Sequence, residues 1–457
     1  MKQFAKEEGR GLSLFALTWP IFIEILLFMM VQFADIFMLS FISDEAVAAV
    51  GVANDLMVVT FILFNFVAVG TGVVVAQYLG ANKKAEASKI AANALVVNLV
   101  FGLMVSLVLV TFRQELLGLF NLDPDVKGYA NRYLLIVGVT LFTQALLFTL
   151  AAIIRSNGFT RDAMYVSLGM NVVNVTGNYL FIFGALGVPQ LGVTGVAIST
   201  AASRILGMIT LFILLYRRLE VRIEWQDYLT LNKGYLKKIL QVGAPAAGEH
   251  MVYQVQQLVF TFFISMLGTA ALATKVYTFN LMMFILLFGV SVGQGMQILI
   301  GRLVGAGGMD EAYRRAFKGL KVSILITVSM AVLFAVFRES LIGIYTDDPH
   351  IISLGATLLL ICLILEPGRT FNLVLISALR ATGDARFPFK MAIVSMWGIS
   401  VPLAYVLGIH FGLGLIGVWI AYTVDEWFRG LIMLGRWKSR KWESKVLVDQ
   451  HGEQTVV

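Results

Sequence analysis

The sequence predicts an all-α polytopic membrane protein in which twelve transmembrane helices form two six-helix lobes. The first observation is composition, because 58% of the 457 residues are hydrophobic and only 14% are charged, which is far from the values of a soluble domain. The second is a series of apolar runs long enough to cross a bilayer, such as ALVVNLVFGLMVSLVLVTF at 94–112. The third is an internal repeat with a period of 225 residues.

Breaks that contain charged residues, Gly or Pro divide the chain into twelve predicted helices. The first has no small-residue cleavage site and many spans follow it, so we interpret it as an uncleaved first helix and not as a signal peptide. The predicted helices of the first half span 14–42, 46–78, 90–112, 128–152, 163–186 and 191–216. Those of the second half span 239–267, 271–303, 316–337, 350–378, 388–409 and 414–436.

The second half of the chain repeats the first. YLGANKKAEASKIA at 78–91 aligns with LVGAGGMDEAYRRA at 303–316, and LGVTGVAI at 191–198 resembles LGLIGVWI at 413–420 after a small deletion, at a shift of 222 residues. Because each half has an even number of helices, we expect a pseudo-twofold axis along the membrane normal, with a cleft between the lobes as the site. The shift of 225 pairs Pro20 with Pro245, Glu24 with Glu249, Arg113 with Arg338, Arg155 with Arg380 and Gly158 with Gly383.

The repeat predicts four parts along the chain. These are an N-terminal lobe at 1–216, a basic interlobe linker at 217–238, a C-terminal lobe at 239–436 and a cytoplasmic tail at 437–457. We expect the linker to form a surface helix, although a plain solvated connector is the alternative. Lys and Arg gather on one side of the predicted membrane, which places both termini in the cytoplasm. As a separate expectation, the membrane is the plasma or inner membrane of a bacterium. The net charge of +7 therefore reflects anionic headgroups and gives little support for nucleic-acid binding.

Motifs of soluble enzymes are missing from the sequence. It contains no GxxxxGK[ST], no HExxH, no paired CxxC, and no GxSxG in a strand–turn–helix context. The single Cys362 excludes an internal disulfide. We therefore predict a transporter and not an enzyme, without a metal or an organic cofactor, and with an ion gradient as its energy source.

Asp35 is a carboxylate inside the apolar stretch MMVQFADIFMLSFIS at 29–43. An ionised Asp near the centre of a membrane helix costs about 2.5–3.5 kcal/mol, so we expect a cavity or a partner around it and not lipid. Its repeat counterpart is Phe260, so the architecture that the halves share does not require the acid, and this asymmetry favours a function. Gln32 lies one turn earlier and is expected to tune the acid.

Three amides in NVVNVTGN project from one stripe of the fifth predicted helix. Asn171, Asn174 and Asn178 are spaced i, i+3 and i+7. Amides orient a carboxylate or bind a cation, so we place Asn174 and Asn178 beside Asp35 in the predicted coupling site. The alternative is a role as interhelical glue, worth roughly 0.6 kcal/mol per bond. Asp55 is a further candidate, unless a place near the outer end of its helix hydrates it.

The predicted substrate cavity combines polar and adaptable side chains. Glu24 is eleven residues before Asp35, which places the two within about 20° of one helix face. Glu24 also recurs as Glu249, so a structural role for both is the alternative. Thioethers and aromatic rings suit large apolar cations. The candidate residues of the cavity are Glu24, Met30, Asn171, Glu249, Tyr253 and Gln256.

Other intramembrane charges of the second half are interpreted as structural. Glu366 and Arg369 are spaced i, i+3 and can form an ion pair. Asp425 and Glu426 are expected to pair with Arg429 along the last helix.

These features together resemble the multidrug and toxic compound extrusion (MATE) family, as a NorM/DinF-like member. The resemblance covers nearly the whole chain. It is carried by the twelve helices in two homologous halves and by the segments ADIFMLSFISDEAVAAVG, QYLGANKKAEA, RSNGFTRDA, RATGDARFP and NVVNVTGNYLFIFGALGVPQLGVTGVAIST.

The resemblance implies cation-coupled export of varied, often cationic and aromatic drugs by alternating access, by a protein that functions as a monomer among membrane lipids. The family's first-helix acid maps onto Asp35, a proposed proton acceptor. Some members have an acid where this chain has Asn178, and members said to use sodium have acids at the places of Tyr253 and Arg369. We therefore expect protons as the coupling ion, with sodium as the alternative, because a sodium site needs several hard oxygens whereas a proton needs one shielded carboxylate.

Two rivals remain at the level of sequence. The first is a flippase of the same fold that exports lipid-linked saccharide or peptidoglycan precursors. Relatives of that type, however, show about fourteen helices and a basic cavity. The second is a membrane enzyme or a passive channel, for which the sequence offers neither a nucleophile and base nor metal-ligand spacing.

Overall fold

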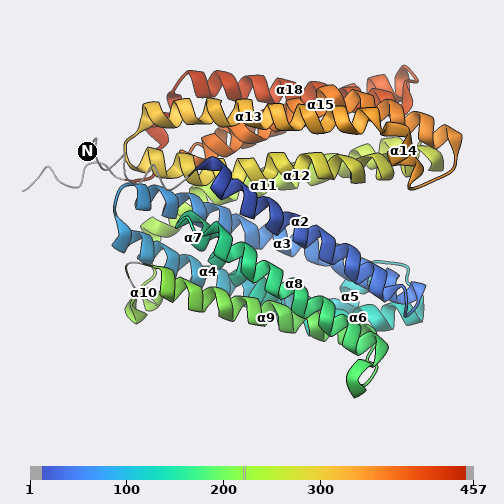
Figure 1. Cartoon of the computed structure of the whole chain (residues 1–457), viewed down its shortest axis with the longest axis horizontal. Coiled ribbons are helices and arrows are strands. Elements are labelled where there is room, and N and C mark those ends of the chain that lie inside the picture. Colours follow the sequence, from blue (N-terminus) through green and yellow to red (C-terminus); the bar gives the residue numbers. More distant parts are fainter. Residues whose placement is uncertain (1–12, 220, 222, 449–457) are drawn as a thin grey trace, which may run out of the picture. The chain divides into compact units, whose positions relative to one another are not determined.

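The computed structural model describes residues 13–219, 221 and 223–448, and these are almost entirely helical (Figure 1). The chain divides into two compact units. The N-terminal unit is Trp19–Gly243, and the C-terminal unit contains the described residues up to Thr18 and from Ala244 onward. The predicted all-helical membrane class is confirmed: in the described part of the chain, nine helices, or ten with the bent pair α6 and α7 counted as one span, are long and apolar enough to cross a membrane.

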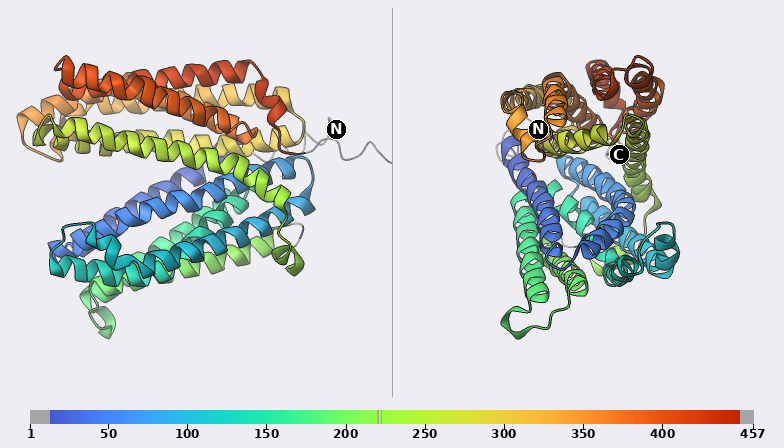
Figure 2. Two further views of the ribbon diagram at one scale, coloured as in Figure 1. Left: turned by 180° about the vertical axis from the view of Figure 1, so that it is seen from behind. Right: turned by 90° about the vertical axis from the view of Figure 1, so that its right-hand side faces the viewer.

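In the N-terminal unit, long helices run side by side and are joined by short turns (Figures 1 and 2). The Ser43 hydroxyl caps the second long helix by accepting a hydrogen bond from Ala46 N at 3.2 Å. Gly184, with φ of +67°, ends the helix that carries the three amides. The elements are α2 (Leu14–Leu39), α3 (Asp44–Gly80), α4 (Lys84–Thr111), α5 (Arg113–Gly118), α6 (Pro124–Val139), α7 (Leu141–Ser156), α8 (Thr160–Phe183), η2 (Ala185–Gly187), α9 (Val193–Arg218) and α10 (Trp225–Leu229).

The C-terminal unit repeats this order of elements. Its fourth long helix begins at Pro349, where Asp348 Oδ1 accepts from His350 N at 2.8 Å. The helix from Arg386 to His410 contains two π-helical turns, one on each side of the segment that contains Pro402. The elements are α11 (Lys233–Ser265), α12 (Thr269–Gly305), α13 (Met309–Val336), α14 (Arg338–Gly343), α15 (Pro349–Ala381), α16 (Arg386–Ser395), η3 (Met396–Ser400), α17 (Val401–Tyr405), η4 (Val406–His410), α18 (Gly414–Lys438) and η5 (Lys441–Lys445).

The predicted fourth helix, 128–152, is a bent pair and not one straight helix. The axes of α6 and α7 differ by 49°. Thr140 lies at the break, and its hydroxyl donates to the carbonyls of Ile136 and Val137 at 3.3 and 3.2 Å. A side chain that bonds back to the preceding turn in this way bends a helix, and hydrophobic periodicity does not show it.

The connection between α9 and α11 is shorter than the predicted linker 217–238. Arg218 still belongs to α9, and α11 already begins at Lys233. Between them, the described residues form only the one-turn helix α10, in place of the expected longer surface helix. The charged ends of the predicted linker are therefore extensions of two long helices.

The internal repeat is visible in the geometry of the two units. α3 and α12 each have 37 residues, and α4 and α13 each have 28. The Arg113 guanidinium donates to the Val110 carbonyl at 2.5 Å, and its counterpart Arg338 donates to the Ala335 carbonyl at 3.1 Å. These equivalent helices and arginines therefore have the same local structure in both halves.

The boundaries between the units lie inside α2 and α11, directly before Pro20 and Pro245. A side chain on Gly70 of α3 would clash with the backbone of Ile239 in the first turns of α11. In the C-terminal unit, a side chain on the repeat counterpart Gly295 would clash with Thr18 in the first turns of α2. Each of these glycines permits a close helix contact, so the beginning of each of the two helices packs on an α3-type helix.

Candidate coupling site

Asp35 lies near the C-terminal end of α2 and faces α8. Its Oδ1 accepts a hydrogen bond of 2.6 Å from Asn178 Nδ2. Asn178 is fully buried, whereas Asp35 is half-buried. A charge-assisted bond of this length is stronger than an ordinary neutral one. The acid therefore has a polar partner inside the helix bundle.

The amides of α8 continue from Asp35 to α9. Asn178 Nδ2 lies 3.4 Å from Asn174 Oδ1, and Asn174 Nδ2 donates to Thr200 Oγ1 at 3.2 Å. A side chain on Gly177 would clash with Ser199, so the absence of one lets α9 approach α8 closely. The structure thus brings Asp35, Asn174 and Asn178 together, as the spacing of the sequence predicts.

Arg204 is a member of this cluster that sequence reasoning missed. It lies on α9 one turn after Thr200 and interacts electrostatically with Asp35 and with Tyr133 of α6. Its guanidinium stands over the Phe61 ring of α3, with Cζ 5.5 Å from the ring centroid. The signal was present, because Arg204 is a lone charge within the apolar part of the predicted helix 191–216.

Two predicted members of the coupling site lie outside the cluster. Gln32 and Asp55 are exposed on α2 and α3, and neither makes a hydrogen bond or ion pair within the described residues. Asn178 Oδ1 is buried and lacks a hydrogen-bond partner in the same set. The coupling cluster, as we use the term below, is Asp35, Tyr133, Asn174, Asn178, Thr200 and Arg204.

The predicted cavity residues of the N-terminal unit are not one group. Glu24 forms an ion pair of 2.8 Å with Arg155 of α7. Met30 is 58% exposed. Asn171 is half-buried, and its Nδ2 has no partner among the described residues.

Comparison with known proteins gives the family. The family model MatE matches residues 20–180 and 245–406, two segments whose first residues are 225 positions apart. The chain belongs to the MATE family. An uncharacterized transporter of Bacillus subtilis, YisQ, is 44% identical over 440 residues, which covers 96% of this chain and 97% of YisQ. A probable multidrug resistance protein NorM of Thermotoga maritima is 28% identical and covers 95% of this chain and 94% of its own.

Solved structures share the fold of this MATE chain. An outward-facing multidrug resistance MATE family transporter of the MOP superfamily aligns with a TM-score of 0.86 at 19% identity and covers 93% of this chain and 95% of its own. A mutant form of the Vibrio cholerae MATE transporter VcmN aligns with a TM-score of 0.86 at 22% identity, and the alignment covers 94% of this chain and 98% of VcmN. These likenesses show the fold, whereas the family match and the NorM relative show that the chain is a NorM-like membrane transporter.

In the MATE chain, the two repeated glutamates form equivalent ion pairs. Glu249 of α11 accepts from Arg380 of α15 at 2.7 Å, as Glu24 of α2 does from Arg155 of α7. All four residues are related by the shift of 225. The pairs join equivalent helices in the two units, which favours the structural alternative for both glutamates.

The C-terminal unit of this MATE transporter buries a network of five charges on α15 and α18. The predicted pair of Glu366 with Arg369 is confirmed at 2.9 Å. Arg429 contacts Asp425 at 2.7 Å and Glu426 at 3.1 Å, as predicted. The network closes because Arg369 also lies 3.5 Å from Glu426.

The remaining predicted cavity residues lie on α11 in the C-terminal unit. Gln256 is buried and donates to Ser400 Oγ at 2.8 Å. Tyr253 is half-buried and lies one turn before Gln257, whose Oε1 accepts from Tyr422 at 2.7 Å. Gln256 therefore has a polar partner within its own unit.

Proposed function

We propose that this MATE transporter exports structurally diverse, often cationic and aromatic compounds in exchange for protons, and that Asp35 binds the proton. The observation that carries the proposal is the hydrogen bond between Asp35 and the fully buried Asn178. The names of relatives such as the NorM protein of Thermotoga maritima support multidrug export. Sodium is the alternative coupling ion.

The Asn178 amide suits both protonation states of Asp35. Its Nδ2 donates to the carboxylate, while its buried Oδ1 has no partner among the described residues. A protonated carboxyl group is a hydrogen-bond donor, which an amide oxygen accepts. Rotation of the amide would then let Asn178 bond the acid in either state, so neither state leaves Asp35 without a partner.

Arg204 gives protonation an electrostatic consequence. With Asp35 ionised, the formal charges of the coupling cluster sum to zero, because Asp35 opposes Arg204 and the other members are neutral. Uptake of a proton leaves the charge of Arg204 uncompensated. A site of low dielectric that gains a positive charge disfavours a bound cation. Proton binding would therefore favour release of a cationic compound, which is the coupling that an exchanger needs.

The test is uptake of ethidium by everted membrane vesicles under an imposed pH gradient. Wild type should accumulate the dye, and Asp35→Asn should not, at equal protein levels in the membrane. Asp125→Asn is the matched control, because Asp125 is exposed in the first turn of α6 and makes no hydrogen bond or ion pair with the coupling cluster within the described residues. Full proton-driven uptake by Asp35→Asn would overturn the assignment of Asp35.

The same vesicles separate the alternatives. Uptake by wild type under a sodium gradient alone, without a pH gradient, would replace protons by sodium in the proposal. Translocation of a lipid-linked saccharide precursor without dye transport would favour the flippase.

A further inference from the structure

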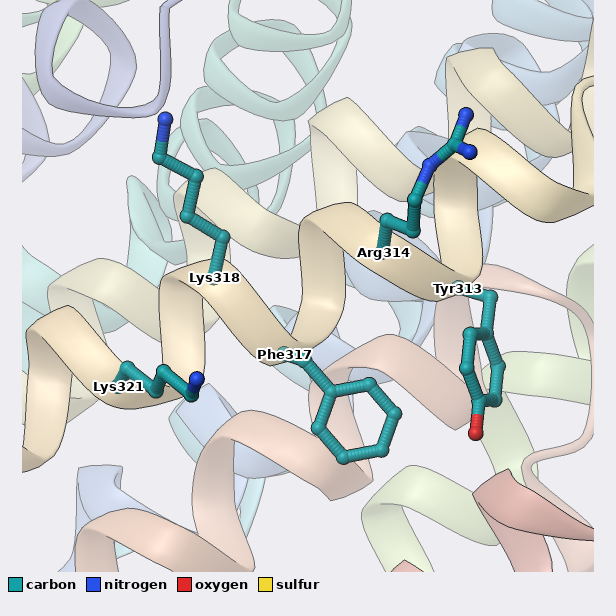
Figure 3. Close-up of a pocket in the computed structure, with 5 residues that line it drawn as sticks. All are labelled: Tyr313, Arg314, Phe317, Lys318 and Lys321. Carbon is teal, nitrogen blue, oxygen red and sulfur yellow. The ribbon is translucent and has the colours of Figure 1, made fainter.

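One side of α13 carries three cations next to two aromatic rings. Arg314, Lys318 and Lys321 are spaced i, i+4 and i+7 and are all exposed. Together with the half-buried rings of Tyr313 and Phe317 they line a cavity of about 290 Å³ (Figure 3). In Figure 3 the Arg314 and Lys318 side chains extend away from the rings, with Lys321 further along the helix. We call these five residues the α13 basic surface.

The positive charge of the α13 basic surface is largely uncompensated. Arg314 contacts Glu311 at 3.0 Å, but Glu311 also pairs with Arg315 at 2.7 Å. Within the described residues, Lys318 and Lys321 take part in no ion pair. The surface therefore suits an anionic partner.

The same side of α13 continues as an apolar stripe. Leu325, Val328 and Val332 follow Lys321 at intervals of four, seven and eleven residues, and they are 68%, 37% and 47% exposed. Residues 322–336 contain no charge, and fifteen helical residues span about 22 Å, most of the hydrocarbon thickness of a bilayer. In a bilayer that α13 spans, Lys318 and Lys321 would lie at the level of the headgroups and the apolar stripe would face acyl chains.

The repeat counterpart of this surface is covered by the protein itself. On α4, Asn93 stands where α13 has Lys318. It donates to the Thr230 carbonyl at 3.2 Å and accepts from Asn232 N at 2.7 Å, so the segment after α10 lies against it. Ser88 of α4 likewise bonds the Val221 carbonyl at 2.9 Å.

The described segment after α18 takes a different course. Arg440 pairs with Asp310 at 2.6 Å, and Trp442 stacks on Trp437 with ring centroids 4.4 Å apart. These contacts hold the segment at the first turn of α13 and the end of α18. Lys318 and Lys321 remain exposed. Arg440 also lies over the Tyr313 ring, with Cζ 5.5 Å from its centroid. Within the described residues, the cover therefore reaches Tyr313 but not Lys318 or Lys321.

We propose that the α13 basic surface binds an anionic phospholipid of the inner leaflet. Its phosphate would lie between Lys318 and Lys321, and its acyl chain would follow Leu325 to Val332. The cations and the exposed apolar stripe lie on one side of the same helix, which matches an amphiphile with an anionic head. A soluble phosphate would contact the cations alone. This inference is independent of the coupling ion and of Asp35.

The test compares phosphatidylglycerol and phosphatidylcholine bound to the purified full chain by native mass spectrometry. Wild type should retain phosphatidylglycerol selectively. The double variant Lys318→Gln, Lys321→Gln should weaken its retention by about twenty-five-fold, since each Lys near an anionic headgroup contributes about a fivefold factor. The matched control is Lys233→Gln, Lys237→Gln, which removes the same charge from exposed positions of α11 and should change retention by less than about threefold.

Three outcomes would overturn the proposal. The first is an equal loss in both double variants, which would mean a general charge effect. The second is displacement of the lipid by millimolar inorganic phosphate, which would mean an anion site without a role for the acyl chain. The third is selective retention that arises only after removal of residues 449–457, which would mean that the end of the chain occupies the surface. Unchanged dye transport and melting temperature in the variants would show that they fold.

Discussion

The two units use one helical framework for opposite kinds of interior. In the N-terminal unit, Asp35 of α2 meets the amide of Asn178. Its repeat counterpart in the C-terminal unit is Phe260 of α11, whose ring packs on Tyr422 with centroids 4.5 Å apart. The framework therefore does not need a polar group at this place, and the N-terminal unit carries one at an energetic cost.

The charges of the C-terminal unit are arranged differently. Each acid of the α15–α18 network has a cation within 3.5 Å, whereas Asp35 has no ion pair of that length within the described residues. A closed network holds its charges in one arrangement. An acid that is bonded mainly by neutral amides changes its protonation at a smaller structural cost. The difference suggests that the C-terminal network stabilises and that the coupling cluster switches.

The largest effect on stability is expected in the α15–α18 network of the C-terminal unit. Arg429→Met removes the cation that holds Asp425 and Glu426. Truncating one partner of a buried ion pair costs about 3–5 kcal/mol, so the melting temperature in detergent should fall strongly. Arg204→Met is the matched variant. We expect it to lower the melting temperature less than Arg429→Met does and to lower ethidium transport more. An equal loss of stability in both variants would remove the distinction between the units.

A smaller effect is expected when Asn178 of the coupling cluster is replaced by the residue at its repeat counterpart in the C-terminal unit. Asn178→Leu introduces the residue that the repeat has at Leu403. It removes the amide that bonds Asp35 and should lower proton-driven ethidium transport by about tenfold or more, because the half-buried carboxylate then lacks its hydrogen-bond donor, a loss of roughly 1–3 kcal/mol of stabilisation. Val175→Leu on the same helix serves as the control for added bulk. Transport equal to wild type in Asn178→Leu would separate the amide from coupling.

The repeated ion pairs should respond alike, with a modest effect. Glu24→Gln and Glu249→Gln each replace a charged acceptor by a neutral one beside a partly buried arginine. We expect each change to cost about 1–2 kcal/mol of stability, since bonds to charged groups are worth about 1.5–3 kcal/mol. Thermal unfolding of the two variants measures this. A loss of transport at full stability, in Glu24→Gln alone, would instead place Glu24 in the transport pathway.

The smallest effect is expected at Asp55. Because Asp55 is exposed and makes no contact with the coupling cluster in the described structure, Asp55→Asn should leave ethidium transport within about twofold of wild type. A surface substitution of this kind changes stability by about 0.5 kcal/mol or less. A transport defect as large as that of Asp35→Asn would show that the cluster extends to α3.

The residues that were predicted correctly share one property. The spacing of Asn174 and Asn178 on one helix, and of Glu366 and Arg369 on another, follows from 3.6 residues per turn, so the sequence is enough to place each pair on one side. The residues that the sequence did not place correctly have no such partner on their own helix within the described residues. Gln32 and Asp55 are exposed, and Arg204 was overlooked although it interacts electrostatically with Asp35.

The sequence by itself determined the membrane class, the twelve helices, the repeat and the identity of the lone acid, because composition and periodicity act along one chain. Only the tertiary structure decided which side of each helix meets which neighbour. The rotation of one helix against another is set by packing, as where Gly177 lets α9 approach α8. That contact brings Thr200 within hydrogen-bond distance of Asn174. The spacing of residues within α8 or within α9 does not predict this pairing.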